Sequence, residues 1–319
     1  ILVGVLMASG TVPTIIYYGL RIFSPSWFLP STLILCAIMS ISTGSSWTTI
    51  GTIGIAFLGI GYGLGIPVGI TAGAIICGAY FGDKQSPVSD STNFAAAVAK
   101  TDLYAHTRSM IYSTAPSFVI SLIIFTLIGA RYHIASIDES QLLQITSGIQ
   151  QVFKLTPILL IPLVVMTVMI IKKMPAIPTM LIAIGIAILE MFIFQHQSFS
   201  EILSYMYSGF ISNTGNAAVD RLLTRGGLTS MTSTVALMFM SLMMAGLMQS
   251  TNIMDSVLNK LEKATSSQFG LIATTLISCI LLSYFAADPY LAMLIPANVL
   301  GKKFDDLGLD RSVLSRTLE

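Results

Sequence analysis

The residues best suited to chemistry lie in one polar stretch, GDKQSPVSDSTN, which occupies positions 82–93 after a long uncharged apolar run. It combines two carboxylates, Asp83 and Asp90, with a cation, Lys84. Carboxylate, hydroxyl and carbonyl oxygens can replace the hydration shell of a hard cation. Ionisable groups within a membrane are costly, and they usually mark the path of an ion or a proton. The stretch therefore predicts a site that binds a cation or a proton.

A proline within this stretch predicts where the helix breaks. Pro87 lacks a backbone donor and pushes the residue before it toward an extended conformation, so a helix that reaches Phe81 is expected to unwind between Gly82 and Pro87. The freed carbonyl groups would then face a cavity together with side-chain oxygens. The predicted cation- and proton-binding residues are Asp83, Ser89, Asp90, Ser91, Thr92 and Asn93. Residue type and spacing leave open which of the two carboxylates carries the proton.

Two features of this stretch have alternative interpretations. Surface loops also collect Gly, Asp, Ser, Pro and Asn, but the apolar segment 68–81 favours a broken helix, because it is too short to cross a membrane alone. Lys84 is predicted to be a charge partner. It either neutralises Asp83 as an ion pair or extends toward the membrane interface.

The composition predicts the environment of these residues. The 319 residues are 54% hydrophobic and 10% charged, whereas soluble domains average about 25% charged residues. We therefore expect an all-α polytopic membrane protein. Apolar stretches near the length of a membrane span occupy residues 1–20, 116–132, 155–171, 175–194, 232–250 and 268–286. Other apolar segments are expected to be too short or too broken to cross alone. The chain opens inside an apolar run without an initiator methionine, so we expect an internal segment of a longer protein.

An interrupted apolar segment predicts a re-entrant hairpin. Residues 27–43 and 55–65 flank the tip 44–54, where small hydroxyl residues can satisfy the backbone inside the protein. The predicted tip residues of the site are Ser45, Ser46, Thr48 and Thr49. Close packing of helices through small residues is an equally good explanation of this composition.

A second interrupted segment places another carboxylate at membrane depth. Apolar residues 271–285 and 290–301 flank Asp288, which is predicted to join the cation- and proton-binding site, or else to be a turn residue before proline. Interrupted segments at corresponding places in two halves indicate inverted repeats around a midplane site. We therefore expect a single transmembrane domain, with repeat one over about 1–132 and repeat two over about 155–319, truncated at its C-terminal end.

Other polar residues in apolar surroundings are expected to be structural. The sequence SGTVPT at residues 9–14 predicts a helix kink, and Glu190 is expected to pack against a polar neighbour or to lie near the membrane interface. The three histidines, His106, His133 and His196, have no metal-ligand spacing, and no phosphate-binding loop of the GxxxxGK type occurs. We therefore expect no enzymatic activity, no cofactor, no nucleic-acid partner and no metal other than transported Na⁺.

A buried carboxylate suggests the mechanism, because low-dielectric surroundings favour its protonated form. Such a group holds either a proton or a cation, and this competition exchanges the two when access alternates between the sides of the membrane. A passive cation channel is an alternative, since hydroxyl-lined tips would suit one. A catalytic pair of Asp83 and Asp288 is a third hypothesis, but neither residue lies in the Tyr-Asp or Gly-x-Gly-Asp pattern of intramembrane proteases.

Three stretches resemble the NhaC family of Na⁺/H⁺ antiporters: ASGTVPTIIYYGL (8–20), TGSSWTTIGTIG (43–54) and, most specifically, GAYFGDKQSPVSDSTNFAAAVAKTDLYAHTRSM (78–110). The resemblance implies a secondary active transporter of bacterial or archaeal plasma membranes that exchanges Na⁺ for H⁺. It also implies the ion-transporter superfamily, whose members have inverted repeats and paired hairpins and move by elevator-like steps. From the family alone we expect a homodimer, and a further Gly/Thr/Ser-Pro break directly after Glu319.

The family that this sequence resembles is not uniform in substrate. Some members exchange malate and protons for lactate and Na⁺, and others are linked to amino acids or similar solutes. An organic anion requires cationic or amide donors near the midplane; the candidates are Lys84, Asn93 and Asn298, and no arginine lies in an apolar span. The prediction is therefore Na⁺/H⁺ exchange, with Na⁺- and H⁺-coupled transport of an organic anion or amino acid as the alternative.

Overall fold

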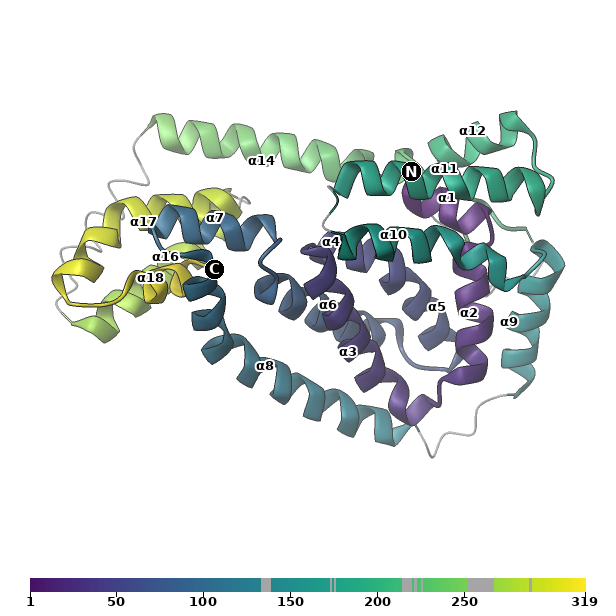
Figure 1. Ribbon diagram of the computed structural model, residues 1–319, viewed down its shortest axis with the longest axis horizontal. Coiled ribbons are helices and arrows are strands. Elements are labelled where there is room, and N and C mark those ends of the chain that lie inside the picture. Colours follow the sequence, from purple (N-terminus) through teal and green to yellow (C-terminus); the bar gives the residue numbers. More distant parts are fainter. Residues whose placement is uncertain are drawn as a thin grey trace. The chain divides into compact units, whose positions relative to one another are not determined.

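The computed structural model describes residues 1–132, 139–172, 174, 176–213, 220, 223–224, 226–251, 267–286 and 289–319. The regular elements formed by these residues are all helices (Figure 1). The all-α fold class expected from the composition is thereby confirmed. The helices form two compact units: Ile1–Asp83 with Ser117–Thr232, and Lys84–Pro116 with Ser233–Glu319.

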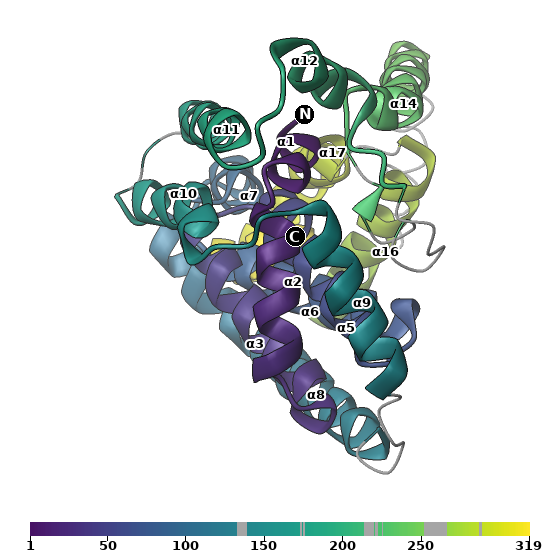
Figure 2. The same cartoon turned by 90° about the vertical axis from the view of Figure 1, so that its right-hand side faces the viewer.

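The first unit contains most of the apolar helices. Its elements are α1 (Leu2–Ala8), α2 (Thr11–Ile22), α3 (Pro25–Thr43), α4 (Ser46–Thr49), the π-helical turn η1 (Ile50–Gly54), α5 (Ile55–Gly63), α9 (Glu139–Val152), η2 (Pro157–Leu160), α10 (Ile161–Ile171), α11 (Ala176–Ile193), α12 (Phe199–Ser208) and η3 (Thr229–Met231), with most of α6 (Val68–Gln85) and the second half of α8 (Leu103–Arg131). α2 and α9 lie side by side (Figure 2), and Gln150 Nε2 donates to the hydroxyl of Tyr17 at 2.9 Å. The core of the unit includes Leu6, Ile16, Phe28, Ile60 and Ile149.

Two breaks bend the helices of the first unit. α1 and α2 meet at 66°, and residues 145–152 and 157–169 meet at 93°. At the first break Gly10 has φ +90°, a left-handed conformation that glycine adopts without strain. Pro13 lies in the first turn of α2, where a missing backbone donor costs little. The kink predicted from SGTVPT is therefore present.

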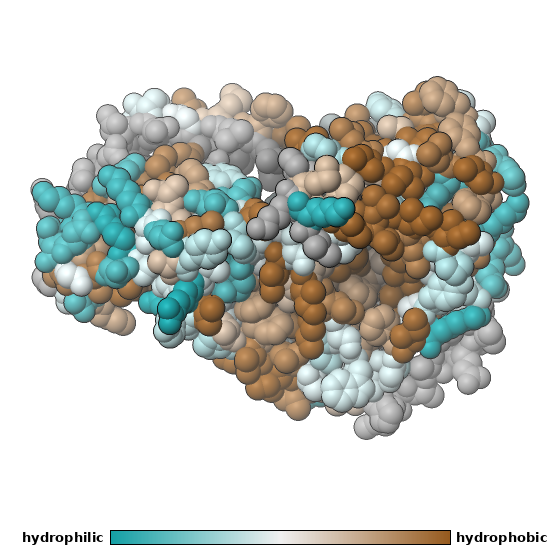
Figure 3. All heavy atoms as spheres, in the orientation of Figure 1, coloured by the Kyte–Doolittle hydropathy of each residue, from teal (hydrophilic) through white to brown (hydrophobic). Residues whose placement is uncertain are grey.

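The described part of the chain has two helices long and apolar enough to cross a membrane, α3 and α8, and each bent pair would add a further span. The expectation that 27–43 is too short to cross alone is wrong, because α3 begins at Pro25 and its 19 residues suffice. Exposed apolar side chains on α10 and α11, such as Val164, Ile177 and Leu181, gather on one face of the first unit (brown in Figure 3). Such a surface suits contact with lipid.

The second unit is built around α17. It comprises α7 (Asp90–Ala99), the first half of α8, α14 (Thr232–Ser250), α16 (Gln268–Ala286), α17 (Pro289–Asp306) and α18 (Arg311–Leu318), with the last residues of α6. α17 packs against α7, α16 and α18, and their shared core includes Ala95, Leu271, Met293, Leu300, Phe304 and Leu314. The two helical arms predicted around 271–285 and 290–301 are confirmed as α16 and α17. Asp288, predicted between them, lies outside the described residues.

Candidate functional site

The end of α6 is held tightly against α3. Gly78 and Gly82 lie one turn apart on α6, and a methyl group added at Gly82 would lie 2.6 Å from Cβ of Ser40. Ser40 Oγ also donates a hydrogen bond to the carbonyl oxygen of Ala79 at 2.5 Å. Small residues four positions apart allow two apolar helices to approach closely. This contact fixes the last turn of α6, where the predicted site begins.

α6 continues further than the sequence predicted. The helix runs from Val68 to Gln85, and the chain leaves it only at residues 86–89. Asp83 and Lys84 therefore lie in the last helical turn, and the prediction of unwinding between Gly82 and Pro87 is wrong in its boundaries. A proline restricts mainly the residue directly before it, so the helix persists to within two residues of the proline.

The tip between α3 and α5 is mostly helical. α3 ends at Gly44, which has a left-handed φ of +63°, and α4 starts after Ser45. Ser45 Oγ accepts from the backbone N–H and from the hydroxyl of Thr48, at 3.2 and 3.1 Å, and Thr49 Oγ1 donates to the carbonyl oxygen of Ser45 at 3.0 Å. Three of the four predicted tip residues thus bond to one another and cap α4.

Asp83 is a buried carboxylate that the fourth tip residue reaches. The residue is 7% exposed, and Ser46 Oγ donates to its Oδ2 at 2.9 Å. Ser46 is the first residue of α4, so the cap at Ser45 also positions this hydroxyl. The structure thus brings together two predicted site residues that are 37 positions apart in sequence. A carboxylate in such surroundings can hold a proton or, when ionised, ligate a cation.

The other predicted oxygens surround the start of α7 in the second unit. The backbone N–H of Ser91 donates to Asp90 Oδ1 at 2.9 Å, and the hydroxyl of Tyr290 donates to Oδ2 at 2.6 Å. Asn93 Nδ2 donates to the carbonyl oxygen of Ser89 at 2.6 Å. Asp90 is exposed, unlike the buried aspartate of α6. The polar side chains here close a turn and begin a helix.

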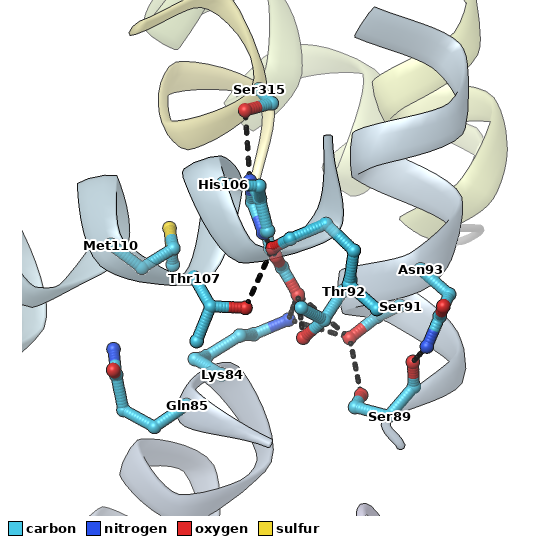
Figure 4. A network of polar contacts seen from close by, with 12 residues as sticks. Lys84, Gln85, Ser89, Ser91, Thr92, Asn93, His106, Thr107, Met110 and Ser315 are labelled. Atoms are coloured by element: carbon cyan, nitrogen blue, oxygen red, sulfur yellow. Dashed lines mark hydrogen bonds and ion pairs between the residues drawn. The ribbon is translucent and has the colours of Figure 1, made fainter. Parts of the chain in front are cut away.

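Lys84 belongs to a network that sequence analysis did not predict (Figure 4). Its Nζ lies 2.8 Å from Oε1 of Glu319 and donates to Ser91 Oγ at 3.1 Å. The hydroxyls of Ser91 and Thr92 donate to the same carboxylate oxygen, at 2.8 and 3.4 Å. His106 Nε2 lies 2.7 Å from the other oxygen, Oε2. Lys84 is therefore a charge partner, and the structure pairs it with a glutamate 235 positions away.

The charge of Glu319 is compensated in this network. Burial acts to raise the pKa of the carboxyl group, but the hydrogen bond with His106 and the charge of Lys84 outweigh it and leave the pKa below its ordinary value. His106 is itself fully buried, and its Nδ1 lies 2.8 Å from the hydroxyl of Ser315. Glu319 therefore acts as a structural carboxylate that joins α18 to the end of α6 and to the start of α8.

No local spacing could have revealed this network. Glu319 lies 213 positions from His106, and each residue sits in a polar segment where solvent exposure is the ordinary expectation. One sequence feature pointed to this network, namely His106, which follows the predicted site closely in the sequence. Once buried, that histidine needs partners for both ring nitrogens.

Similarity to known proteins covers the whole chain. A model described as the Na⁺/H⁺ antiporter family matches residues 78–319. The chain is 38% identical over its full length to the malate-2H⁺/Na⁺-lactate antiporter of Bacillus subtilis, and 38% to the Na⁺/H⁺ antiporter NhaC of Alkalihalophilus pseudofirmus, and it covers 68% and 69% of them. It is 35% identical to the arginine/ornithine antiporter ArcD of Halobacterium salinarum, over 98% of this chain and 64% of that protein. No solved structure matches.

Proposed function

Because the chain belongs to the Na⁺/H⁺ antiporter family, we propose that it exchanges Na⁺ for H⁺ by alternating access, with Asp83 binding each in turn. The chain is a multi-pass membrane protein, and the bacterial and archaeal sources of its relatives favour the plasma membrane. One observation carries the choice of residue. Asp83 is a buried carboxylate at the end of α6, and the hydroxyl of Ser46 from the hairpin tip is bonded to it at 2.9 Å.

Asp83 suits this role better than Asp90. Water stabilises the charge of a buried carboxylate less than that of an exposed one, so burial favours occupation by either a proton or Na⁺. Because the carboxylate favours being occupied by one of the two ions, release of one is coupled to binding of the other. The exposed Asp90 lacks this constraint, because water can stabilise its charge, and its bonds to Ser91 and Tyr290 explain it as the first residue of α7.

A second candidate function is exchange of an organic anion coupled to Na⁺ and H⁺. It is favoured by the 38% identity to the malate-2H⁺/Na⁺-lactate antiporter, which equals the identity to NhaC. An organic anion requires a cationic or amide donor. Lys84, however, is bound to Glu319, Asn93 donates to backbone carbonyl oxygens, and Asn298 is exposed. These observations favour Na⁺ as the sole solute exchanged for protons.

The proposal can be tested in inverted membrane vesicles that contain the full-length protein. A pH-sensitive dye inside the vesicles should report proton movement when Na⁺ is added. Asp83→Asn should abolish this response, and Asp90→Asn, the matched control, should keep most of it. Exchange at the wild-type rate by Asp83→Asn would disprove the assignment. A response that requires malate or lactate in addition to Na⁺ would establish the second function instead.

A further inference from the structure

The break between α1 and α2 has its backbone groups occupied by side chains from after α11. Gln197 Nε2 donates to the carbonyl oxygen of Ala8 at 3.3 Å, and Gln195 Nε2 donates to that of Ser9 at 3.1 Å. The left-handed Gly10 makes this approach possible, since a methyl group there would lie 2.8 Å from Gln195 Nε2. The carbonyl groups of Ala8 and Ser9 at the break are therefore engaged.

A buried carboxylate lies against this break. Glu190, on α11, is 4% exposed, and its Oε2 lies 3.4 Å from Thr11 Oγ1. Thr11 Oγ1 lies 2.7 Å from Ser9 Oγ, and Ser9 Oγ lies 3.3 Å from the carbonyl oxygen of Leu6. Among the described residues Glu190 Oε1 has no hydrogen-bond partner. The packing of Glu190 against a polar neighbour, expected from the sequence, is confirmed.

Among the described residues around Glu190, no charged side chain compensates the carboxylate. Titratable side chains on or beside the elements packed around it are Tyr17, Tyr18 and Arg21 of α2, Lys154 before η2, Lys172 after α10, His196 after α11, and Glu201, Tyr205 and Tyr207 of α12. The guanidinium of Arg21 lies over the ring of Tyr17 at 4.3 Å, and Lys154, Lys172 and His196 are exposed. In the part of the chain that the structure describes, Glu190 forms an ion pair with none of them.

An ionised carboxylate in this position would be a buried charge with one long hydrogen bond, which is costly. A proton removes the charge and keeps the hydrogen-bonded contacts in place. Glu190 then donates to Thr11, Thr11 donates to Ser9, and Ser9 donates to the carbonyl oxygen of Leu6. Each hydroxyl in this series of contacts then has an acceptor. The oxygen atoms of all three pairs already lie at the distances given above.

We propose that Glu190 binds and releases a proton at the break between α1 and α2, as a second proton site in addition to Asp83. A proton suits the group better than Na⁺, because the carbonyl oxygens of Ser9 and Ala8 already accept from Gln195 and Gln197. The part of Glu190 in transport rests on the proposed function, whereas proton binding itself does not.

Infrared difference spectroscopy of the purified full-length protein tests the binding. The carbonyl stretching band of a protonated carboxyl group should be present in the wild type and vanish as the pH is raised. Glu190→Gln should lose one component of that band, and Glu201→Gln, which alters an exposed capping residue, should keep it. An unchanged band in Glu190→Gln would overturn the proposal. If that variant does not fold, the isosteric Thr11→Val can be used in its place. This substitution should move the pH midpoint of the band, and an unchanged midpoint would likewise overturn the proposal.

The coupling ratio in proteoliposomes tests whether the proton is transported. Glu190→Gln should still exchange, because Asp83 is intact, but with fewer protons per Na⁺ and therefore a shifted reversal potential. A lost infrared component with an unchanged ratio would show a static proton and contradict release. Absence of Na⁺-driven proton movement in the wild type would instead disprove the proposed function and leave the infrared result standing.

Discussion

Glu190 and Glu319 are both buried acidic residues, yet the donors around them differ in charge. The donors to Glu319 include an ammonium and an imidazole group, whereas a threonine hydroxyl contacts Glu190. Hydrogen bonds from charged donors are roughly twice as strong as those from neutral ones. Strong pairing suits a carboxylate that keeps one charge state, and weak pairing suits one that changes it.

The pH dependence of stability should reveal the role of Glu319. Because its pKa in the folded protein lies below the ordinary value, the ionised group stabilises the fold above that ordinary range, and the contribution is lost as pH falls through the folded pKa. Glu319→Gln should therefore lower stability at neutral pH by about 3 kcal/mol, since it leaves buried partners without a counter-charge. The difference from wild type should shrink in acid. Thermal unfolding of the purified full-length protein across pH measures both.

The matched control is the exposed ion pair of Asp305 and Arg311 in the same unit, whose side chains are 49% and 28% exposed. Exposed pairs contribute about 1 kcal/mol or less, so Asp305→Asn should change stability little at any pH. A stability loss in Glu319→Gln that is the same at neutral and acid pH would show that packing, and not charge, explains the role of Glu319.

At the scale of elements, the contact between α3 and α6 determines where the buried aspartate lies. Gly78 and Gly82 form the close-approach face of α6, and Ser40 of α3 contacts both the helix backbone and the space that a side chain at Gly82 would fill. The hairpin tip begins directly after α3. A change in the distance between α3 and α6 should therefore also change the distance between the tip and the end of α6.

Gly82→Ala should destabilise the protein and weaken exchange. The added methyl group would lie 2.6 Å from Cβ of Ser40, and overpacking of this kind costs about 1–3 kcal/mol. Gly69→Ala is the control on the same helix, because no atom lies within 4 Å of a methyl group there. Thermal unfolding and vesicle exchange should show a loss for Gly82→Ala and none for Gly69→Ala. Equal behaviour of the two variants would contradict the packing account.

The sequence predicted elements better than their ends. The interrupted pattern around residues 44–54 predicted two helical arms, and both are present as α3 and α4–η1–α5. The end of α6 was misplaced because proline constrains its immediate neighbour more than the preceding turn. The left-handed Gly44 and the cap at Ser45 make the tip more helical than its Gly, Ser and Thr content indicated.

The sequence suggested candidate site residues only where the polar residues are close together in the chain, and their roles stay a prediction. The acidic, hydroxyl-rich stretch that begins at the end of α6 includes Asp83, and the tip composition includes Ser46, but only the fold shows that these two meet. Glu319 was missed because its partners are more than two hundred positions away. The inverted repeats predicted from the two interrupted segments stay a prediction.

At the scale of the whole molecule, the polar groups buried in this membrane protein are divided between its two units. The first unit contains Asp83, the hairpin tip and Glu190, so both proposed proton sites belong to it. The second contains the Glu319 network, which joins the ends of four helices. Exchange chemistry is thereby proposed for one unit, and a compensated ionic network stabilises the other.

The central claim is that Na⁺ and a proton compete for Asp83, and proton release on Na⁺ binding tests it most directly. Calorimetric titration of the purified full-length protein with Na⁺, in two buffers that differ in ionisation enthalpy, gives the number of protons released. We expect the wild type to release protons as Na⁺ binds, and Asp83→Asn to release none. Equal proton release by Asp83→Asn and the wild type would contradict the account.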